Sequence, residues 1–151
     1  MIKIIRANSE NIDFVYLVKQ LDEYLTIIDE DEHDFYNLYN NIDVLKHTII
    51  AYLNNKPVGC GAFKKFDKNC VEIKRMFTSP EARSMGIASK ILKELEVWAK
   101  EIGYNSTILE TGKRQIEAVN FYKKNHYQVI PNFGQYKNMD NSLCFKKCLI
   151  K

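Results

Sequence analysis

The stretch Arg83-Ser84-Met85-Gly86-Ile87-Ala88-Ser89 places small and cationic residues where a long helical pattern begins. The first N–H groups of a helix have no internal partner, and the helix dipole is positive there. Gly86 and Ala88 would let a phosphate reach the backbone, and Arg83 and Ser89 could add side-chain donors. The stretch has neither the G-K-[ST] of a Walker A loop nor a G-x-G-x-x-G fingerprint. It predicts a phosphate or pyrophosphate site, although a simple helix-starting turn explains the loop alone equally well.

The segments around this stretch predict a strand before it and a helix after it. Apolar residues recur on one helical face from Ile87 to Ile102, and Gly103 closes the pattern, which predicts a helix of about four turns. Segments 48–53, 58–63 and 71–78 are typical of strands joined by turns, so they predict an antiparallel meander.

The remaining elements follow the same rules. The opening residues Ile2–Ile5 predict a strand, and Ser9 is the expected cap of a helix whose apolar positions run from Phe14 to Ile28. The other expected elements are a short helix at 33–40, strands at 107–111, 127–130 and 143–149, and a helix at 116–124. The order β-α-α-β-β-β-α-β-α-β-β predicts a single mixed α/β domain over residues 1–151.

Composition excludes several classes of function. The 22 basic and 19 acidic residues give a net charge of +3 and are dispersed, which argues against a nucleic-acid-binding surface. The four cysteines show no C-x-x-C pair and no zinc spacing, so we expect reduced thiols and no metal site. Without a signal peptide or a membrane-spanning run, the expected location is cytoplasmic, away from membranes.

The region from Val71 to Tyr127 resembles a known family. It reads VEIKRMFTSPEARSMGIASKILKELEVWAKEIGY and then ILETGKRQIEAVNFYKKNHY, with Arg83 to Ala88 as an R-x-x-G-x-A motif. These motifs closely resemble the GCN5-related N-acetyltransferases, the GNAT family. The resemblance implies a mostly antiparallel mixed sheet with helices on both faces, splayed between its fourth and fifth strands.

The same resemblance implies acetyl-CoA as the cosubstrate. Backbone amides of Arg83, Ser84, Met85, Gly86, Ile87, Ala88 and Ser89 would wrap the pyrophosphate of acetyl-CoA. Met76, Phe77 and Thr78 would lie beside the pantetheine arm, which inserts where the strands part at Met76 and Leu109. An amide near Phe77 could polarise the thioester carbonyl.

Acetyl transfer to an amine needs a neutral nucleophile, a stabilised oxyanion and a proton for the departing thiolate. Tyr122 ends the A-x-x-x-Y motif that starts at Ala118, where many family members place the tyrosine that protonates or hydrogen-bonds the CoA sulfur. Glu72 resembles the general-base glutamate of histone-type members, and Glu110 on the opposing strand is a second candidate. Water alone can suffice for amines of low pKa.

Two positions depart from the family pattern. Gln115 stands where an asparagine commonly contacts CoA, seven residues before the tyrosine, and Asn120 is the substitute donor in the same helix. His126 replaces the usual glycine before the final aromatic residue, so a left-handed backbone must be adopted by His126 or Asn125.

The acceptor is expected between the first two helices and the loop that joins the last strands. These segments are Asp29–Tyr36, which is rich in carboxylates, and Pro131–Ser142. Carboxylates would favour a cationic amine, and Tyr36, Phe133 and Tyr136 could wall the pocket. Small amines and lysine-like groups are therefore the expected acceptors.

Three alternatives stay open at this point. The same fold could serve as a non-catalytic acyl-CoA-binding or sensing domain, which a groove plugged by Tyr36 or Tyr136 would favour. Transfer to oxygen, or of a longer acyl chain, depends on the volume beside the sulfur. A homodimer is possible because the last strands of such folds often meet a partner.

Overall fold

The computed structural model describes residues 1–29 and 45–149, and its elements follow the expected order. The predicted helix at 33–40 lies outside these residues. The strands are β1 (Ile2–Ala7), β2 (His47–Leu53), β3 (Lys56–Lys65), β4 (Cys70–Thr78), β5 (Ser106–Gly112), β6 (Gln128–Ile130) and β7 (Ser142–Cys148). The helices are α1 (Ile12–Asp29), α3 (Ile87–Glu101) and α4 (Ile116–Lys124), with short 3₁₀ turns η2 (Pro80–Ala82) and η3 (Gly134–Tyr136).

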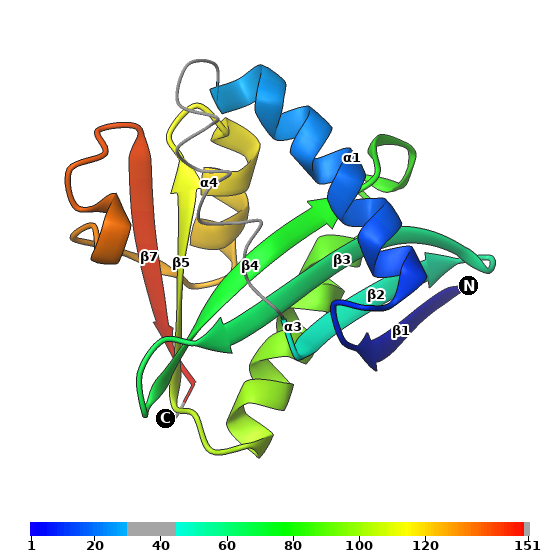
Figure 1. Cartoon of the computed structure of the whole chain (residues 1–151), viewed down its shortest axis with the longest axis horizontal. Coiled ribbons are helices and arrows are strands. Elements are labelled where there is room, and N and C mark those ends of the chain that lie inside the picture. The colour runs from blue at the N-terminus through cyan, green and yellow to red at the C-terminus, as the bar shows by residue number, and fades with distance from the viewer. Residues whose placement is uncertain (30–44, 150–151) are drawn as a thin grey trace.

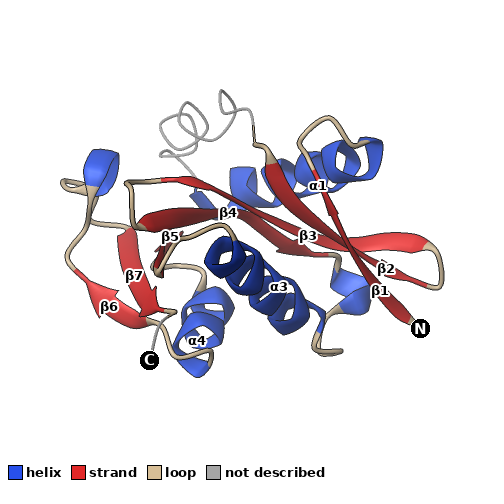
Figure 2. Ribbon diagram, turned by 90° about the horizontal axis from the view of Figure 1, so that it is seen from below, coloured by secondary structure: helices blue, strands red, loops and turns tan. Residues whose placement is uncertain are grey.

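One seven-stranded sheet in the order β1-β2-β3-β4-β5-β7-β6 forms the middle layer (Figure 1). Helix α1 covers one face, and α3 and α4 cover the other (Figure 2). Two apolar clusters result, one between α1 and strands β2 to β4, the other between the sheet and the α3–α4 layer. The mixed fold with helices on both faces, predicted from the sequence, is confirmed.

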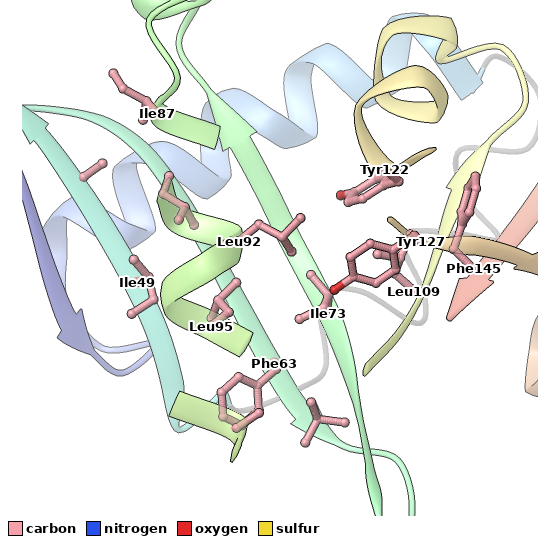
Figure 3. Close-up of a cluster of buried hydrophobic side chains, with 14 of the residues drawn as sticks. Ile49, Phe63, Ile73, Ile87, Leu92, Leu95, Leu109, Tyr122, Tyr127 and Phe145 are labelled. Atoms are coloured by element: carbon pink, nitrogen blue, oxygen red, sulfur yellow. The ribbon is translucent and has the colours of Figure 1, made fainter. Parts of the chain in front are cut away.

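Helix α3 anchors the larger cluster. Ile91, Leu92 and Leu95 are fully buried on its inner face, and burial of each side chain contributes about 1.5–3 kcal/mol (Figure 3). Two glycines of β3 allow this close approach: a Cβ on Gly61 would lie 2.9 Å from Ile91 and Leu95, and one on Gly59 would lie 2.9 Å from Ile91. Close helix packing therefore explains the glycines in this strand.

The strand registers position the future site. Strands β2, β3 and β4 form the predicted antiparallel meander, whereas β4 and β5 are parallel and pair only from Cys70↔Ser106 to Glu72↔Ile108. Beyond Glu72 the two strands part, and their facing edges no longer form ladder hydrogen bonds with each other. The predicted splay between the fourth and fifth strands is confirmed.

A bulge bends β4 directly after the point of divergence. The β3–β4 register shifts between Cys60 and Ala62, so that two residues of β4 oppose one residue of β3. Arg75 lies in the bulge with φ of 60°, a left-handed conformation that is uncommon outside glycine. The bulge changes which side chains of β4 reach the α1 face.

The start of α1 corrects one prediction. The Asn11 side-chain oxygen accepts hydrogen bonds from the N–H groups of Asp13 (2.9 Å) and Phe14 (3.2 Å), so Asn11 caps the helix and the prediction of Ser9 was wrong. The Ser9 hydroxyl instead accepts a hydrogen bond from the N–H of Leu45 at 3.2 Å. Both residues are good caps, and this contact with the segment before β2 decides between them.

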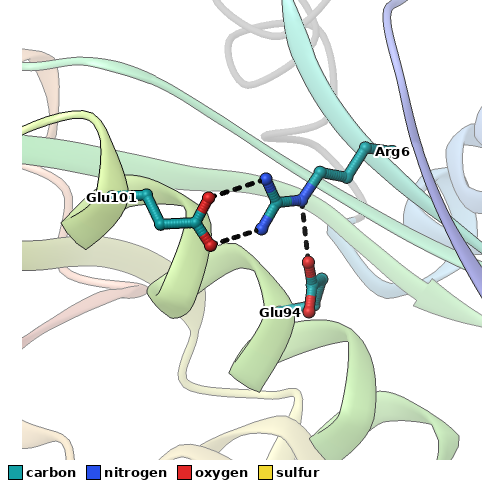
Figure 4. A network of polar contacts seen from close by, with 3 residues as sticks. All are labelled: Arg6, Glu94 and Glu101. Carbon is teal, nitrogen blue, oxygen red and sulfur yellow. Dashed lines mark hydrogen bonds and ion pairs between the residues drawn. The ribbon is translucent and has the colours of Figure 1, made fainter.

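Polar contacts tie the edge of the sheet to α3. The Arg6 guanidinium on β1 contacts Glu94 at 2.8 Å and makes a two-pronged pair with Glu101 at 2.8 and 3.0 Å (Figure 4). Arg6 holds the pKa of Glu101 below its usual value, but both groups are exposed, so solvent and salt weaken the pair.

All four cysteines are free thiols, of which Cys148 alone is exposed, in agreement with the sequence. None of the described helices is long and apolar enough to cross a bilayer.

Candidate active site

The loop between β4 and α3 has the geometry of an anion site. Gly86 is the N-cap of α3 and adopts φ of +77°, which favours glycine. A Cβ built on Gly86 would meet no other atom of the described residues within 4 Å, so it would project into open space ahead of the helix. Ser84 also has positive φ, 69°, and the loop thus turns twice before α3 begins.

Arg83 fixes the entry to this loop. Its Nε donates a hydrogen bond of 3.1 Å to the carbonyl of Thr78 at the end of β4. Its guanidinium also lies 5.5 Å from the centre of the Tyr24 ring on α1, within cation–π range. Arg83 therefore links β4, the loop and the helix on the opposite side of the sheet.

A groove of about 640 Å³ runs from this loop along the diverging edge of β4. Its walls come from α1, the end of β4, the loop, and the start and inner face of α4. The lining residues include Leu21, Tyr24, Met76, Phe77, Thr78, Arg83, Ser84, Gly86, Ile87, Ala88, Ser89, Arg114, Gln115, Ala118, Tyr122 and Lys124.

A smaller cavity of about 120 Å³ adjoins the groove. Both share Leu21, Met76, Gln115, Ala118 and Tyr122, so the two spaces meet between β4 and α4. Four ionisable side chains from the strands and one tyrosine from η3 line the smaller cavity: Glu72, Lys74, Arg75, Glu110 and Tyr136.

Tyr122 stands at the junction of the two spaces. It lies on α4 and is only 6% exposed, packed beside Tyr127 and Phe145 (Figure 3). Burial raises the pKa of its phenol well above 10, and the negative charge of Glu110 raises it further. The phenol therefore keeps its proton across the physiological range.

Two carboxylates, one on β4 and one on β5, line the smaller cavity. Glu72 is 4% exposed at the last position of β4 that pairs with β5, and Glu110 is half-buried on β5. Tyr136 is buried, and burial together with the charges of Glu110 and Glu72 raises the pKa of its phenol. The charges of Glu72 and Glu110 thus both act on Tyr136, in the space that opens where β4 and β5 part after Glu72.

Basic groups lie on the α1 side. Lys74 and Arg75 are buried where β4 bulges, and Nη1 of Arg75 contacts the carboxylate of Asp22 on α1 at 2.8 Å. The Arg75 side chain is 6% exposed and that of Asp22 31%, so water screens this pair less than the pairs of Arg6.

Most of the residues predicted for the site come together, and a few do not. Among the loop residues Met85 is exposed and does not line the groove, and Asn120 is exposed on α4 away from it. Tyr36 and most of the acidic stretch lie outside the described residues. His126, with φ of 74°, adopts the left-handed conformation expected of His126 or Asn125.

Sequence reasoning missed the basic residues of the smaller cavity and, apart from Arg83, those of the groove. Lys74 lies two residues after Glu72, so strand alternation places both on one face and was an available signal. Arg75 reaches the same cavity because of the bulge, for which Gly61 on the facing strand was an available signal. Arg114 and Lys124 line the groove from the start and the end of α4.

Comparisons with known proteins agree with this architecture. One relative is the "IAA acetyltransferase" of Azospirillum brasilense, 29% identical over 137 residues that cover 89% of this chain and 90% of the relative. A Klebsiella pneumoniae structure assigned as an acyl-CoA N-acyltransferase has a TM-score of 0.83 at 24% identity, covering 99% of both chains. A GNAT family acetyltransferase of Elizabethkingia anophelis, solved with acetyl-CoA bound, has a TM-score of 0.67 at 18% identity, covering 96% of both.

The sequence model of the acetyltransferase (GNAT) family matches residues 14–127, from the first buried turn of α1 to the residue before β6. The match therefore includes the loop, the diverging strands and Tyr122 together. This chain belongs to the acetyltransferase (GNAT) family.

Proposed function

We propose that this protein is an acetyl-CoA-dependent N-acetyltransferase that acts on a primary amine. One observation carries the proposal: a groove that starts at a helix N-terminus meets a second cavity lined by carboxylates, and Tyr122 lies at the junction. A donor in the groove and an acceptor in the cavity would have their reacting ends side by side.

The groove suits CoA from one end to the other. N–H groups at the start of α3 would bind the pyrophosphate, and Arg83, Arg114 and Lys124 supply positive charge nearby. The edge of β4 beyond Glu72 offers backbone groups to the amides of pantetheine, and Met76 and Phe77 offer apolar surface. Acetyl-CoA in the related Elizabethkingia structure supports this choice of cosubstrate.

The proposed reaction is a direct transfer in a ternary complex. The neutral amine nitrogen attacks the thioester carbonyl, and a backbone amide of β4 near Phe77 stabilises the oxyanion. The tetrahedral intermediate collapses by breaking the C–S bond. The products are an acetamide and CoA thiol, and the proton lost by the amine balances the proton gained by sulfur.

Tyr122 would serve the leaving sulfur. Because burial and Glu110 raise the pKa of its phenol, the hydroxyl stays protonated and can donate a hydrogen bond to the developing thiolate. The same shift makes complete proton transfer less favourable. We therefore assign Tyr122 as a hydrogen-bond donor to sulfur, with the final proton supplied by the acceptor ammonium or by water.

Glu72 and Glu110 would prepare the amine. A carboxylate beside the acceptor attracts its ammonium form and accepts a proton from it, directly or through water. Glu72 is the more buried of the two, whereas Glu110 is the carboxylate whose charge raises the pKa of Tyr122. We assign Glu72 as the base and Glu110 as the group that orients the amine.

Two successive measurements test the proposal. Thermal shifts with CoA and acetyl-CoA report binding, and an acceptor screen of polyamines, amino acids and a lysine peptide reports CoA thiol release. We expect stabilisation by both forms and thiol release with at least one amine. Stabilisation without release by any amine would favour the non-catalytic acyl-CoA sensor, and absence of stabilisation would refute both functions.

A further inference from the structure

The smaller cavity contains charges of both signs. Two carboxylates, Glu72 and Glu110, and two cations, Lys74 and Arg75, line a space of about 120 Å³. A cavity built only to attract a cationic amine would need the carboxylates alone. The basic residues therefore need their own explanation.

Interactions within the protein compensate these charges in part. Lys74 is 6% exposed and the Arg75 side chain is also 6% exposed, and Arg75 pairs with Asp22 at 2.8 Å. Replacing buried ion pairs by apolar side chains of similar volume is often neutral or stabilising, so stability alone does not require charges of both signs here. Their place beside the acceptor space is the reason to consider a ligand that carries both charges.

One carboxylate and one cation lie on different sides of the cavity. Glu110 lies on β5 near Tyr122 and Tyr136, whereas Arg75 is held to α1 by its 2.8 Å contact with Asp22. Glu72 and Lys74 lie two residues apart on the same face of β4, so charges of both signs also occur side by side in the cavity. The negative charge of Glu110 is therefore next to Tyr122, and the positive charge of Arg75 is on the α1 side.

The cavity has room for a small acceptor group. Its volume is about 120 Å³, and it opens into the larger groove at the residues that the two spaces share. A polyamine would also place a second cation against Lys74 and Arg75, which like-charge repulsion disfavours.

We propose that the acceptor is a small zwitterion of the amino-acid type, a primary amine that also carries a carboxylate. Glu110 holds its amine beside Tyr122, and Lys74 with Arg75 holds its carboxylate toward α1. This inference rests on the proposed N-acetyltransferase function and specifies the substrate class of the same site.

Three ligands that share an aminoethyl group and differ beyond it test the inference on the full-length protein saturated with CoA. β-Alanine ends in a carboxylate, propylamine in a methyl group and 1,3-diaminopropane in a second ammonium. We expect β-alanine to bind the CoA complex at least about tenfold more tightly than either amine, as charge-assisted hydrogen bonds to a carboxylate imply. Isothermal titration calorimetry measures these affinities without requiring turnover.

Variants then test whether Lys74 is responsible for the preference for β-alanine over propylamine. Lys74→Met should reduce the advantage of β-alanine over propylamine by about tenfold, and Lys74→Arg should retain it. Lys65→Met, which removes an exposed lysine of β3 outside the cavity, is the matched control and should leave the advantage unchanged. Should Lys74→Met fail to fold, the wild-type ranking and Lys74→Arg still decide.

The outcomes separate this inference from the proposed function. Equal binding of the three ligands, or preference for 1,3-diaminopropane or a lysine peptide, overturns the zwitterion inference, while acetylation of any amine leaves the proposed function standing. Loss of the β-alanine preference in Lys65→Met as well as Lys74→Met also overturns it. No stabilisation by acetyl-CoA overturns the proposed function and this inference together.

Discussion

The groove and the smaller cavity differ in the parts of the chain that build them. The groove has backbone groups available at two places, the start of α3 at one end and the edge of β4 that β5 leaves unpaired. Side chains dominate the cavity, where Glu72, Lys74 and Glu110 project from two strands. Backbone groups do not depend on residue type, so they suit a cosubstrate that a whole family would share. Side chains change with the sequence, so they suit an acceptor that differs between members.

This contrast predicts that substitutions will separate the two spaces. Substitutions in the loop should change only the affinity for acetyl-CoA, and substitutions of the carboxylates should change only kcat/KM for the amine. Substitution at the junction should lower kcat and leave both binding affinities unchanged.

Substitution at the junction should have the largest effect. Tyr122→Phe removes the hydroxyl and keeps the ring packed beside Tyr127 and Phe145. We expect kcat to fall by about 100- to 1,000-fold, the usual range for loss of one positioned hydrogen-bond donor to developing charge, with the Kd of acetyl-CoA changed by less than about threefold. Steady-state kinetics and calorimetry measure the two quantities, and an unchanged kcat would remove Tyr122 from the mechanism.

Substitution in the smaller cavity should have the next largest effect. Glu72→Gln keeps the shape of the side chain but removes its charge, and we expect kcat/KM for the amine to fall by roughly 10- to 100-fold, because Glu110 remains to attract the ammonium. The affinity for acetyl-CoA should not change.

Glu117→Gln provides the matched control, since Glu117 is an exposed carboxylate that lines the groove. Its substitution should leave kcat/KM for the amine within about twofold, as for surface charges generally. Equal losses in the two variants would show that the spaces are not independent.

Substitution in the loop should have a smaller effect, which is confined to the affinity for acetyl-CoA. In Gly86→Ala the left-handed backbone costs about 1–2 kcal/mol, so the free loop shifts toward other conformations that acetyl-CoA binding must reverse, and the new Cβ stands in open space beside the groove where phosphate would approach. We therefore expect acetyl-CoA to bind about 5- to 30-fold more weakly. Gly103→Ala places a similar strain, at φ of +106°, at the opposite end of α3.

Titration with acetyl-CoA under equal conditions compares the two variants. Gly103→Ala should lose stability in thermal unfolding and keep its affinity. If Gly103→Ala binds acetyl-CoA as weakly as Gly86→Ala does, the loss reflects general destabilisation of α3 and the loop has no direct role.

The pH dependence should show the smallest effect. A raised pKa means that the Tyr122 phenol stays protonated above its ordinary pKa of 10, so its ionisation should lower kcat by less than about twofold between pH 7 and 10. Rates rise over this range as the acceptor loses its proton. An alkaline decline below pH 10 that disappears in Tyr122→Phe would contradict the assignment.

Patterns that repeat along the chain could be predicted from the sequence. The long amphipathic helix, the meander and the glycine loop before α3 follow from periodicity and turn residues, and they place the groove. The A-x-x-x-Y motif from Ala118 to Tyr122 located Tyr122 through the resemblance to the GNAT family.

Features that depend on single contacts could not be predicted. Asn11 rather than Ser9 caps α1 because Leu45 engages Ser9, a contact across 36 residues. Arg75 reaches the cavity through a bulge opposite Gly61, where no periodic signal exists. The sequence therefore predicted Glu72, Glu110 and Tyr136 of the smaller cavity, whereas Lys74 and Arg75 of that cavity and Arg114 and Lys124 of the groove needed the structure.

Product stoichiometry tests the central claim most directly. Purified protein is incubated with acetyl-CoA and a mixture of primary amines, and CoA thiol and acetylated amine are quantified together by mass spectrometry. The account predicts that both products appear in equal amounts and that neither appears when amines are omitted. Thiol release that does not depend on an amine, or binding of acetyl-CoA with no acetylated amine from any acceptor, would contradict it.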